Sequence, residues 1–229
     1  MSAAIVVREF PSKRNQVRLL RGEEGLFVEK YFSSPEAAAK EARVYRLLMG
    51  SGVKTASLLE AEGRRLYLSY LPGEDYLSLL ERQEAGIYSE GEGCLLLPWE
   101  RLLDYLAAFH RATGMVQRDM NLRNFLWLGR EAAGLDFEDC HPGSLSQSFA
   151  TLAAYVRTYD PPGTEIKKRV GAYIEERAVK WGLCDAQTFA ALLSTEEEVI
   201  TLRRKRRVGD SLRLQGRKST VGGGDSKEL

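Results

Sequence analysis

Apolar and polar residues alternate in short runs over the first third of the chain. Between Ile5 and Leu71 this period-two pattern predicts several strands. One helical segment interrupts them and begins at Ser34-Pro35, where the serine can cap a helix and the proline suits its first turn. We therefore expect residues 1–71 to form a small antiparallel sheet with one helix.

The pattern changes after residue 71. The segment YLPGEDYL interrupts the alternation, and a glycine-rich loop follows at 86–98. Apolar residues then return with helical spacing at Trp99, Leu102, Leu103, Leu106 and Phe109. Further helices are predicted at about 145–158, 164–181 and 186–207. The chain is thus expected to be an α+β protein with an N-terminal part at 1–71, a mainly helical part at 72–207 and a flexible, basic and glycine-rich tail at 208–229.

Charge and cysteine content exclude several classes of protein. The 33 basic residues nearly balance the 32 acidic ones, so no overall field draws the chain to nucleic acid or to a membrane surface. The three cysteines are widely spaced, which disfavours both a disulfide framework and a zinc site and fits a reducing compartment. No segment approaches the roughly 20 apolar residues of a membrane span. We expect a cytoplasmic protein without a membrane span.

Lys30 is the first residue with candidate chemistry. In a strand it shares one face with Leu26, Val28 and Phe32, which places an ammonium group among apolar side chains. Glu41 on the next helix lies beside the face that should meet the sheet. A lone buried charge costs several kcal/mol, so the two residues are expected to pair with each other. The alternative is that Lys30 reaches solvent at the sheet edge and Glu41 faces outward.

A second group of polar residues follows the helix that ends in LAAFHRATG. The order of segments is helix, polar loop, the strand FLWL, a turn and the strand AAGLD. Asp119 and Asn124 then lie at the two ends of one loop and Asp136 at the end of the second strand, so all three can point to one place. Carboxylate and amide oxygens suit magnesium, and a further carboxylate can accept a proton from a hydroxyl group.

These segments together resemble the protein-kinase-like superfamily. Lys30, Glu41, YLPGEDYL, RDMNLRN and LDFED occur in the order found in that superfamily, and they are most similar to its small phosphotransferase branch, which includes the aminoglycoside, choline and lipopolysaccharide sugar kinases. The resemblance covers about residues 18–160. It implies a two-lobed kinase-like fold that uses ATP and Mg²⁺.

The resemblance also implies a role for each matching residue. Lys30 would bind the α- and β-phosphates and Glu41 would brace it, while Asp119 would be the catalytic base. Asn124 and Asp136 would hold magnesium. The backbone of residues 69–71 would contact adenine, and Gly22 and Gly25 would belong to a loop that covers the phosphates. The cofactor-binding candidates are therefore Lys30, Glu41, Gly22, Gly25, Ser69, Tyr70 and Leu71.

The sequence departs from the kinase pattern at three places. Gln117 stands where kinases have a histidine, and the serines at 144 and 148 stand where relatives have aspartates. Because the later aspartate supports the loop that carries the histidine, we interpret the joint change of Gln117 and Ser148 as a coupled exchange, which requires the two residues to lie close together. Glu23 and Glu24 between the two glycines would repel a triphosphate, so a plain hairpin turn is the alternative there.

We expect transfer of the γ-phosphoryl group of ATP to a hydroxyl group on a small molecule, a sugar or a lipid headgroup. One alternative is a compact protein Ser/Thr kinase or ATPase similar to the kinase of the KEOPS tRNA-modification complex. Another is a nucleotide-binding pseudokinase that serves as a scaffold. The basic segment at 203–218 predicts either a solvated helix end or contact with a phosphate-rich partner such as nucleic acid.

Overall fold

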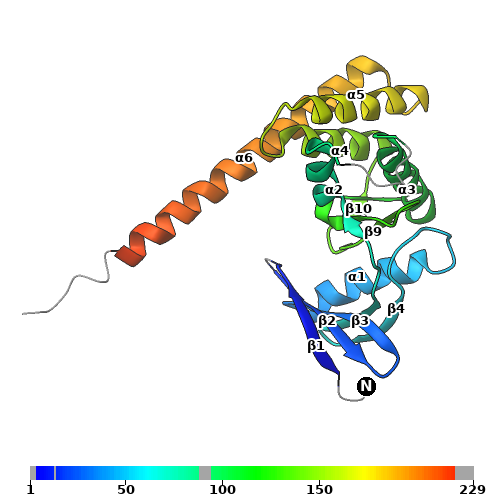
Figure 1. The fold of residues 1–229 in the computed structure, drawn as a ribbon, viewed down its shortest axis with the longest axis vertical. Helices are drawn as coiled ribbons and strands as arrows, with labels where there is room; N and C mark the ends of the chain where they lie inside the picture. Colours follow the sequence, from blue (N-terminus) through cyan, green and yellow to red (C-terminus); the bar gives the residue numbers. More distant parts are fainter. Residues whose placement is uncertain (1–3, 13, 88–93, 220–229) are drawn as a thin grey trace, which may run out of the picture.

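The computed structural model describes residues 4–12, 14–87 and 94–219, and the side chains of residues 204–219 are outside the described part. The part of the glycine-rich loop at 88–93, the end of the expected tail at 220–229 and most side chains of the basic segment at 203–218 therefore lie outside the described residues. Within the described part the chain is an α+β protein (Figure 1), which confirms the expected fold class.

The N-terminal part is a five-stranded antiparallel sheet with the strand order β1-β2-β3-β5-β4. Its strands are β1 (Ile5–Phe10), β2 (Gln16–Gly22), β3 (Gly25–Tyr31), β4 (Leu58–Glu62) and β5 (Arg65–Ser69). The single helix α1 (Pro35–Leu48) begins where the sequence predicts, because the Ser34 side chain accepts a hydrogen bond from the Ala37 backbone N–H. The predicted small sheet with one helix is confirmed.

The C-terminal part is mainly helical. Its helices are α2 (Tyr76–Glu84), α3 (Leu97–Thr113), α4 (Leu145–Thr158), α5 (Glu165–Lys180) and α6 (Ala186–Ser219), with a short 3-10 turn η2 (Leu122–Asn124). Its strands are β6 (Glu74–Asp75), β7 (Met115–Gln117), β8 (Phe125–Trp127), β9 (Ala132–Gly134) and β10 (Cys140–Pro142). The predicted β8–β9 hairpin is present and antiparallel.

Two features differ from the sequence-based expectation. The helix expected to end near residue 207 continues to Ser219, where an irregular tail was expected from 208, and it extends away from the rest of the protein (Figure 1). Helix α2 was not predicted. It starts directly after the Pro72-Gly73 interruption because Asp75 caps it by accepting from the N–H groups of Leu77 and Ser78.

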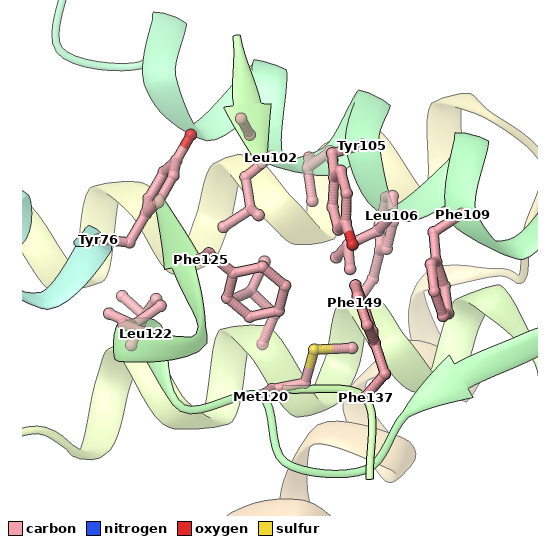
Figure 2. Close-up of a cluster of buried hydrophobic side chains, with 14 of the residues drawn as sticks. Tyr76, Leu102, Tyr105, Leu106, Phe109, Met120, Leu122, Phe125, Phe137 and Phe149 are labelled. Atoms are coloured by element: carbon pink, nitrogen blue, oxygen red, sulfur yellow. The ribbon is translucent and has the colours of Figure 1, made fainter. Parts of the chain in front are cut away.

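The apolar core of the C-terminal part lies between α3, α4 and the short strands (Figure 2). The residues predicted at helical spacing are almost completely buried: Trp99, Leu102, Leu103, Leu106 and Phe109. Phe137 extends this core to the N-terminal part. Its ring stacks on Phe109 of α3, with the ring centroids 5.5 Å apart, and meets Tyr45 of α1 edge-on, with the centroids 5.0 Å apart. The segment around Phe137 is thereby packed from both sides.

A backbone contact also joins the two parts. Thr55, between α1 and β4, forms a parallel bridge with Gly134 of β9, and its hydroxyl donates to the Gly134 carbonyl at 2.9 Å. A Cβ atom at 134 would lie 1.8 Å from the Tyr105 hydroxyl oxygen, so only glycine fits here. The end of β9 is therefore held at a fixed place beside the N-terminal part.

No helix among the described residues is long and apolar enough to span a bilayer.

Candidate active site

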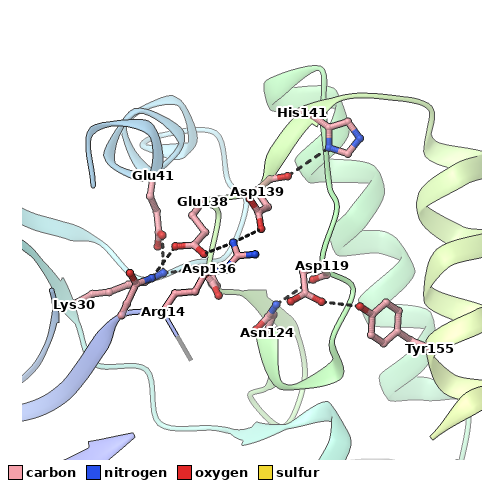
Figure 3. Close-up of polar contacts among 11 residues, drawn as sticks. Arg14, Lys30, Glu41, Asp119, Asn124, Asp136, Glu138, Asp139, His141 and Tyr155 are labelled. Carbon is pink, nitrogen blue, oxygen red and sulfur yellow. Dashed lines mark hydrogen bonds and ion pairs between the residues drawn. The ribbon is translucent and has the colours of Figure 1, made fainter. Parts of the chain in front are cut away.

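Lys30 lies near the end of β3, with only 6% of its surface exposed. Its Nζ donates to Glu41 Oε2 at 2.6 Å and to Asp136 Oδ1 at 2.6 Å (Figure 3). Glu41 belongs to α1 and is fully buried, and Asp136 follows β9. The pairing of Lys30 with Glu41 that the sequence suggests is thus found in the structure, and Asp136 joins it.

Burial and charge oppose each other at this ion pair. Burial lowers the pKa of the Lys30 amine, but the carboxylates of Glu41 and Asp136 outweigh it, so the net pKa lies above its ordinary value. Burial raises the pKa of Glu41 to about 7, although Lys30 acts in the opposite direction. Buried ion pairs contribute little net stability because both charges must be desolvated. Their presence here is better explained by a function that needs the charges.

Asp136 has a left-handed backbone, with φ at 59°. Residues other than glycine avoid this conformation, and it persists only where the surrounding structure fixes it. Two contacts do so here, because the Leu135 N–H donates to the Asn124 carbonyl at 2.8 Å and the Phe137 ring is fully buried. The strained turn directs the carboxylate of Asp136 toward Lys30.

Asp119 and Asn124 lie at the two ends of the loop between β7 and β8, as predicted. The Asn124 side-chain amide donates to the Asp119 carbonyl at 3.0 Å, which closes the loop and leaves the amide oxygen for another contact. Asp119 Oδ1 accepts from the Tyr155 hydroxyl at 2.8 Å (Figure 3) and from the Asn121 N–H at 3.3 Å. Burial, followed by the negative charge of Asp119, raises the pKa of Tyr155, so its hydroxyl stays a donor.

Three carboxylates gather beside Lys30. Glu41, Asp136 and Glu138 each offer an oxygen, and these oxygens lie within 4.8 Å of one another. Glu41 is fully buried, so the partly exposed Asp136 and Glu138 are the more accessible pair. Carboxylate oxygens together with the amide oxygen of Asn124 are ligands that suit a hard divalent cation.

Arg14 and Asn15, which sequence reasoning missed, contact this acidic cluster. The Asn15 side-chain amide donates to Glu138 Oε2 at 2.7 Å, and Arg14 Nη1 lies 3.3 Å from Glu138 Oε1 and 3.1 Å from Asp139 Oδ2. Both residues belong to the connection between β1 and β2, whose sequence is an ordinary polar turn. Tyr155 was also missed, since it lies inside a predicted helix with no local signal for its partner.

The structure does not bring Gly22 and Gly25 to the site. They face each other at the two-residue turn between β2 and β3, whereas Lys30 pairs with Val17 at the opposite end of the hairpin. At about 3.4 Å per residue, the five positions from Gly25 to Lys30 span about 17 Å. The turn is the plain hairpin that the sequence left as an alternative, and the β1–β2 connection lies nearer the acidic cluster.

Ser69, Tyr70 and Leu71 lie where the sheet gives way to the C-terminal part. Ser69 ends β5 opposite Phe27 of β3, and its N–H donates to the Ser57 carbonyl at 2.9 Å. That donor is already used, so an adenine contact at this edge would need the backbone of Tyr70 or Leu71. Both residues directly follow β5, which pairs with β3, the strand that carries Lys30.

Gln117 supports the turn that carries Asp136. Its side-chain amide donates to the Leu135 carbonyl at 3.0 Å, directly before Asp136. Gln117 and Ser148 line the same cavity, but the Gln117 amide donates to Leu135 and not to Ser148, so their coupled exchange stays a hypothesis. A neutral amide thus holds the turn by hydrogen bonding where the kinase pattern has a histidine.

The arrangement combines a buried amine, a group of oxygen ligands and a separate carboxylate within one region. The amine can bind an anion such as a phosphate, the oxygens can bind a divalent cation, and Asp119 can accept a proton. No protein-family model matches the sequence, and no curated protein matches it either. What the site can do is therefore inferred from its own residues.

Proposed function

We propose that the protein is an ATP- and Mg²⁺-dependent phosphotransferase that acts on a hydroxyl group. The observation that carries this proposal is the double contact of Lys30 Nζ with Glu41 and Asp136, both at 2.6 Å. A buried cation held between two carboxylates from separate segments has a clear use if it also binds a polyphosphate next to a metal ion.

Lys30 and Glu41 form the phosphate-binding part of the proposed site. Lys30 donates to phosphate oxygens, while Glu41 keeps the amine charged and holds its direction. Because Glu41 is anchored in α1, the position of that helix decides where the amine points. Preorganised charges of this kind stabilise the charge that develops during phosphoryl transfer.

The residues present fit a magnesium ion. Asn124 and Asp136, with Glu138 beside them, offer oxygen donors, and nucleotide and water oxygens would complete the six ligands that magnesium prefers. When bound, the ion neutralises charge on the phosphates. The contact of Asp136 with Lys30 supports this arrangement, because it keeps the proposed metal ligand beside the proposed phosphate-binding amine.

Asp119 acts on the acceptor. Its carboxylate orients the acceptor hydroxyl and takes its proton. The acceptor oxygen then bonds to the γ-phosphorus, and the bond between that phosphorus and the β,γ-bridging oxygen breaks, which releases ADP. Tyr155 and the Asn121 N–H fix one carboxylate oxygen, so the other oxygen is directed to the acceptor.

Exchange of two carboxylates tests the proposal. We expect Asp136→Asn and Asp119→Asn each to lower ADP formation from Mg-ATP by at least about 100-fold, since each removes a charge used in the transition state. Asp104→Asn, which breaks only a surface ion pair with Arg101, is the matched control. Near-normal turnover in either site variant would refute the assignment.

The unchanged chain also decides between enzyme and scaffold. A thermal-shift titration with ATP and MgCl₂ measures binding, and ADP formation measures turnover. Binding without turnover would favour the nucleotide-binding scaffold. This alternative is considered because Gln117 stands where kinases have a histidine. If ATP neither binds nor is turned over, the proposal that the protein uses a nucleotide is wrong.

A further inference from the structure

A polar cavity of about 400 Å³ lies next to the loop that carries Asp119. It is bounded by β7 and the following residue, by β10, by the first turns of α4 and by α6. Its size is within the range of small-molecule sites. The roles proposed above for Lys30, Glu41, Asn124 and Asp136 do not use it.

The charged groups of this cavity are mainly cationic. Arg118 and Arg203 line it from two sides, and Glu196 is the one carboxylate among the lining residues. The N-terminal turn of α4 also faces it through Gln147 and Ser148, which adds the positive end of a helix dipole. Two guanidinium groups with a helix N-terminus suit the oxygens of a phosphate group.

One of the residues that line the cavity has an unused acceptor. Gln117 is 4% exposed and lines the cavity, and its Oε1 is buried and makes no hydrogen bond with any described residue. Leaving such an oxygen unpaired costs about 1–3 kcal/mol. A hydroxyl group on a bound ligand would satisfy it, and Glu196 offers a second acceptor nearby in the same cavity.

Three contacts relate the cavity to Asp119. Arg118 directly precedes Asp119 in the chain. Tyr155, which donates to Asp119 at 2.8 Å, lies one helical turn after the lining residue Thr151 on α4. The Arg203 side chain is close enough to Tyr155 for its charge to affect that hydroxyl. The cavity therefore lies beside the segments that carry the proposed base and its partner Tyr155.

We propose that this cavity is the acceptor site and that the acceptor is a phosphate ester that also carries free hydroxyl groups. The inference rests on the proposed function and names its substrate class. The phosphate of the acceptor is bound by Arg118 and Arg203, its hydroxyls bond to Gln117 and Glu196, and one hydroxyl reaches Asp119. That hydroxyl receives the γ-phosphoryl group, its proton passes to Asp119 and ADP leaves.

Direct binding tests the acceptor class without turnover. The full chain is titrated by calorimetry with ribose 5-phosphate and with ribose, each with and without Mg-ADP. We expect ribose 5-phosphate to bind at least about tenfold more tightly than ribose, which corresponds to about 1.4 kcal/mol. Vesicles that contain phosphatidylglycerol form a second arm, because a lipid headgroup can supply the same phosphate and hydroxyl groups. Binding to neither probe overturns the proposal.

Variants locate the binding in the cavity. Arg203→Ala and Arg118→Ala should each weaken ribose 5-phosphate binding by about tenfold or more, because each removes a charge-assisted hydrogen bond, and Arg203→Lys should restore part of it. Both arginines are exposed, so the fold should persist. Arg169→Ala, an exposed arginine outside the cavity, is the charge-matched control. Equal losses in all three alanine variants would overturn the assignment to this cavity.

The outcomes separate this inference from the proposed function. If Mg-ATP binds and turns over but no phosphate ester binds, the acceptor class is wrong and the phosphotransferase remains. If ribose 5-phosphate binds in an Arg203-dependent way but Mg-ATP does not bind, the phosphate site stands and its role as an acceptor site falls. If both bind, ribose 5-phosphate should accelerate ADP formation above the rate with ribose.

Discussion

The amine of Lys30 lies 2.6 Å from a carboxylate oxygen of Asp136, although 106 positions separate the two residues in the chain. The same amine contacts Glu41 on α1. One cation therefore ties a strand and a helix of the N-terminal part to a strained turn of the C-terminal part. Through this contact the relative position of the two parts and the geometry of the proposed site depend on each other.

We expect Lys30→Met to lower the free energy of unfolding by about 3–5 kcal/mol at pH 8, because it leaves the buried Glu41 carboxylate without a cation. The loss should shrink as the pH falls. Burial raises the pKa of Glu41 to about 7 with Lys30 present, and losing Lys30 raises it further. A carboxyl whose pKa is higher in the folded protein favours folding at low pH, and that contribution disappears as the pH rises through this pKa.

Urea unfolding at pH 5 and pH 8 measures this effect. The control is the double variant Lys30→Met with Glu41→Gln, which has no carboxylate at position 41 and should lose less stability at pH 8 than Lys30→Met alone. A loss of equal size at both pH values in Lys30→Met would show that Glu41 does not depend on the amine.

Tyr155→Phe should lower kcat for phosphate transfer by about tenfold and leave the KM for ATP unchanged, since the hydroxyl orients Asp119 and lies apart from the proposed nucleotide contacts. Steady-state kinetics with Mg-ATP checks this. Tyr173→Phe, which removes a hydroxyl that accepts from the nearby Arg177 on α5, is the control. A rise in KM with unchanged kcat would instead place Tyr155 in nucleotide binding.

Arg14→Ala should weaken Mg-ATP binding by about tenfold while Tm hardly changes. The guanidinium neutralises the negative charge of Glu138 and Asp139, which would otherwise repel a triphosphate. Its side chain is 68% exposed, so its ion pairs contribute little to stability. Arg18→Ala, which removes another exposed pair with Glu9 in the sheet, is the matched control in a nucleotide titration. Equal affinities in both variants would contradict a role of the β1–β2 connection.

Cys140 should react slowly with thiol reagents, whereas the exposed Cys94 should react quickly. Burial raises the pKa of Cys140 to about 12, so its thiolate fraction stays small through pH 9. Labelling with a chromogenic disulfide measures both rates. Cys140→Ala should keep the fast phase and Cys94→Ala should lose it, while unfolding in urea should make every thiol react. A fast phase that depends on Cys140 would show that β10 opens readily.

Local patterns were sufficient for much of the fold and part of the site. The period-two strand and the helix cap at Ser34 correctly place Lys30 and Glu41 on facing surfaces, because both signals depend on residues within one element. The β8–β9 hairpin likewise follows from two short apolar runs and the turn between them. The proximity of Asp119, Asn124 and Asp136 follows from that hairpin.

The remaining parts depend on contacts between distant segments. The hairpin register decides that Gly22 and Gly25 lie far from Lys30, and no local signal in the glycines reveals that register. Arg14 and Tyr155 reach the site across long sequence separations and look like an ordinary turn and an ordinary helix position. Strands β7 and β10 have three residues each, too few for a period to be recognised.

The left-handed backbone of Asp136 also limits which residues can replace it. Asparagine and glycine tolerate this conformation, whereas alanine or glutamate would have to bend the chain differently. If the proposed phosphoryl transfer is the activity, a lineage that lost it would therefore be expected to drift toward asparagine or glycine at this position before any other residue. Inactive relatives should therefore carry asparagine or glycine in place of Asp136, while the fold around this position is unchanged.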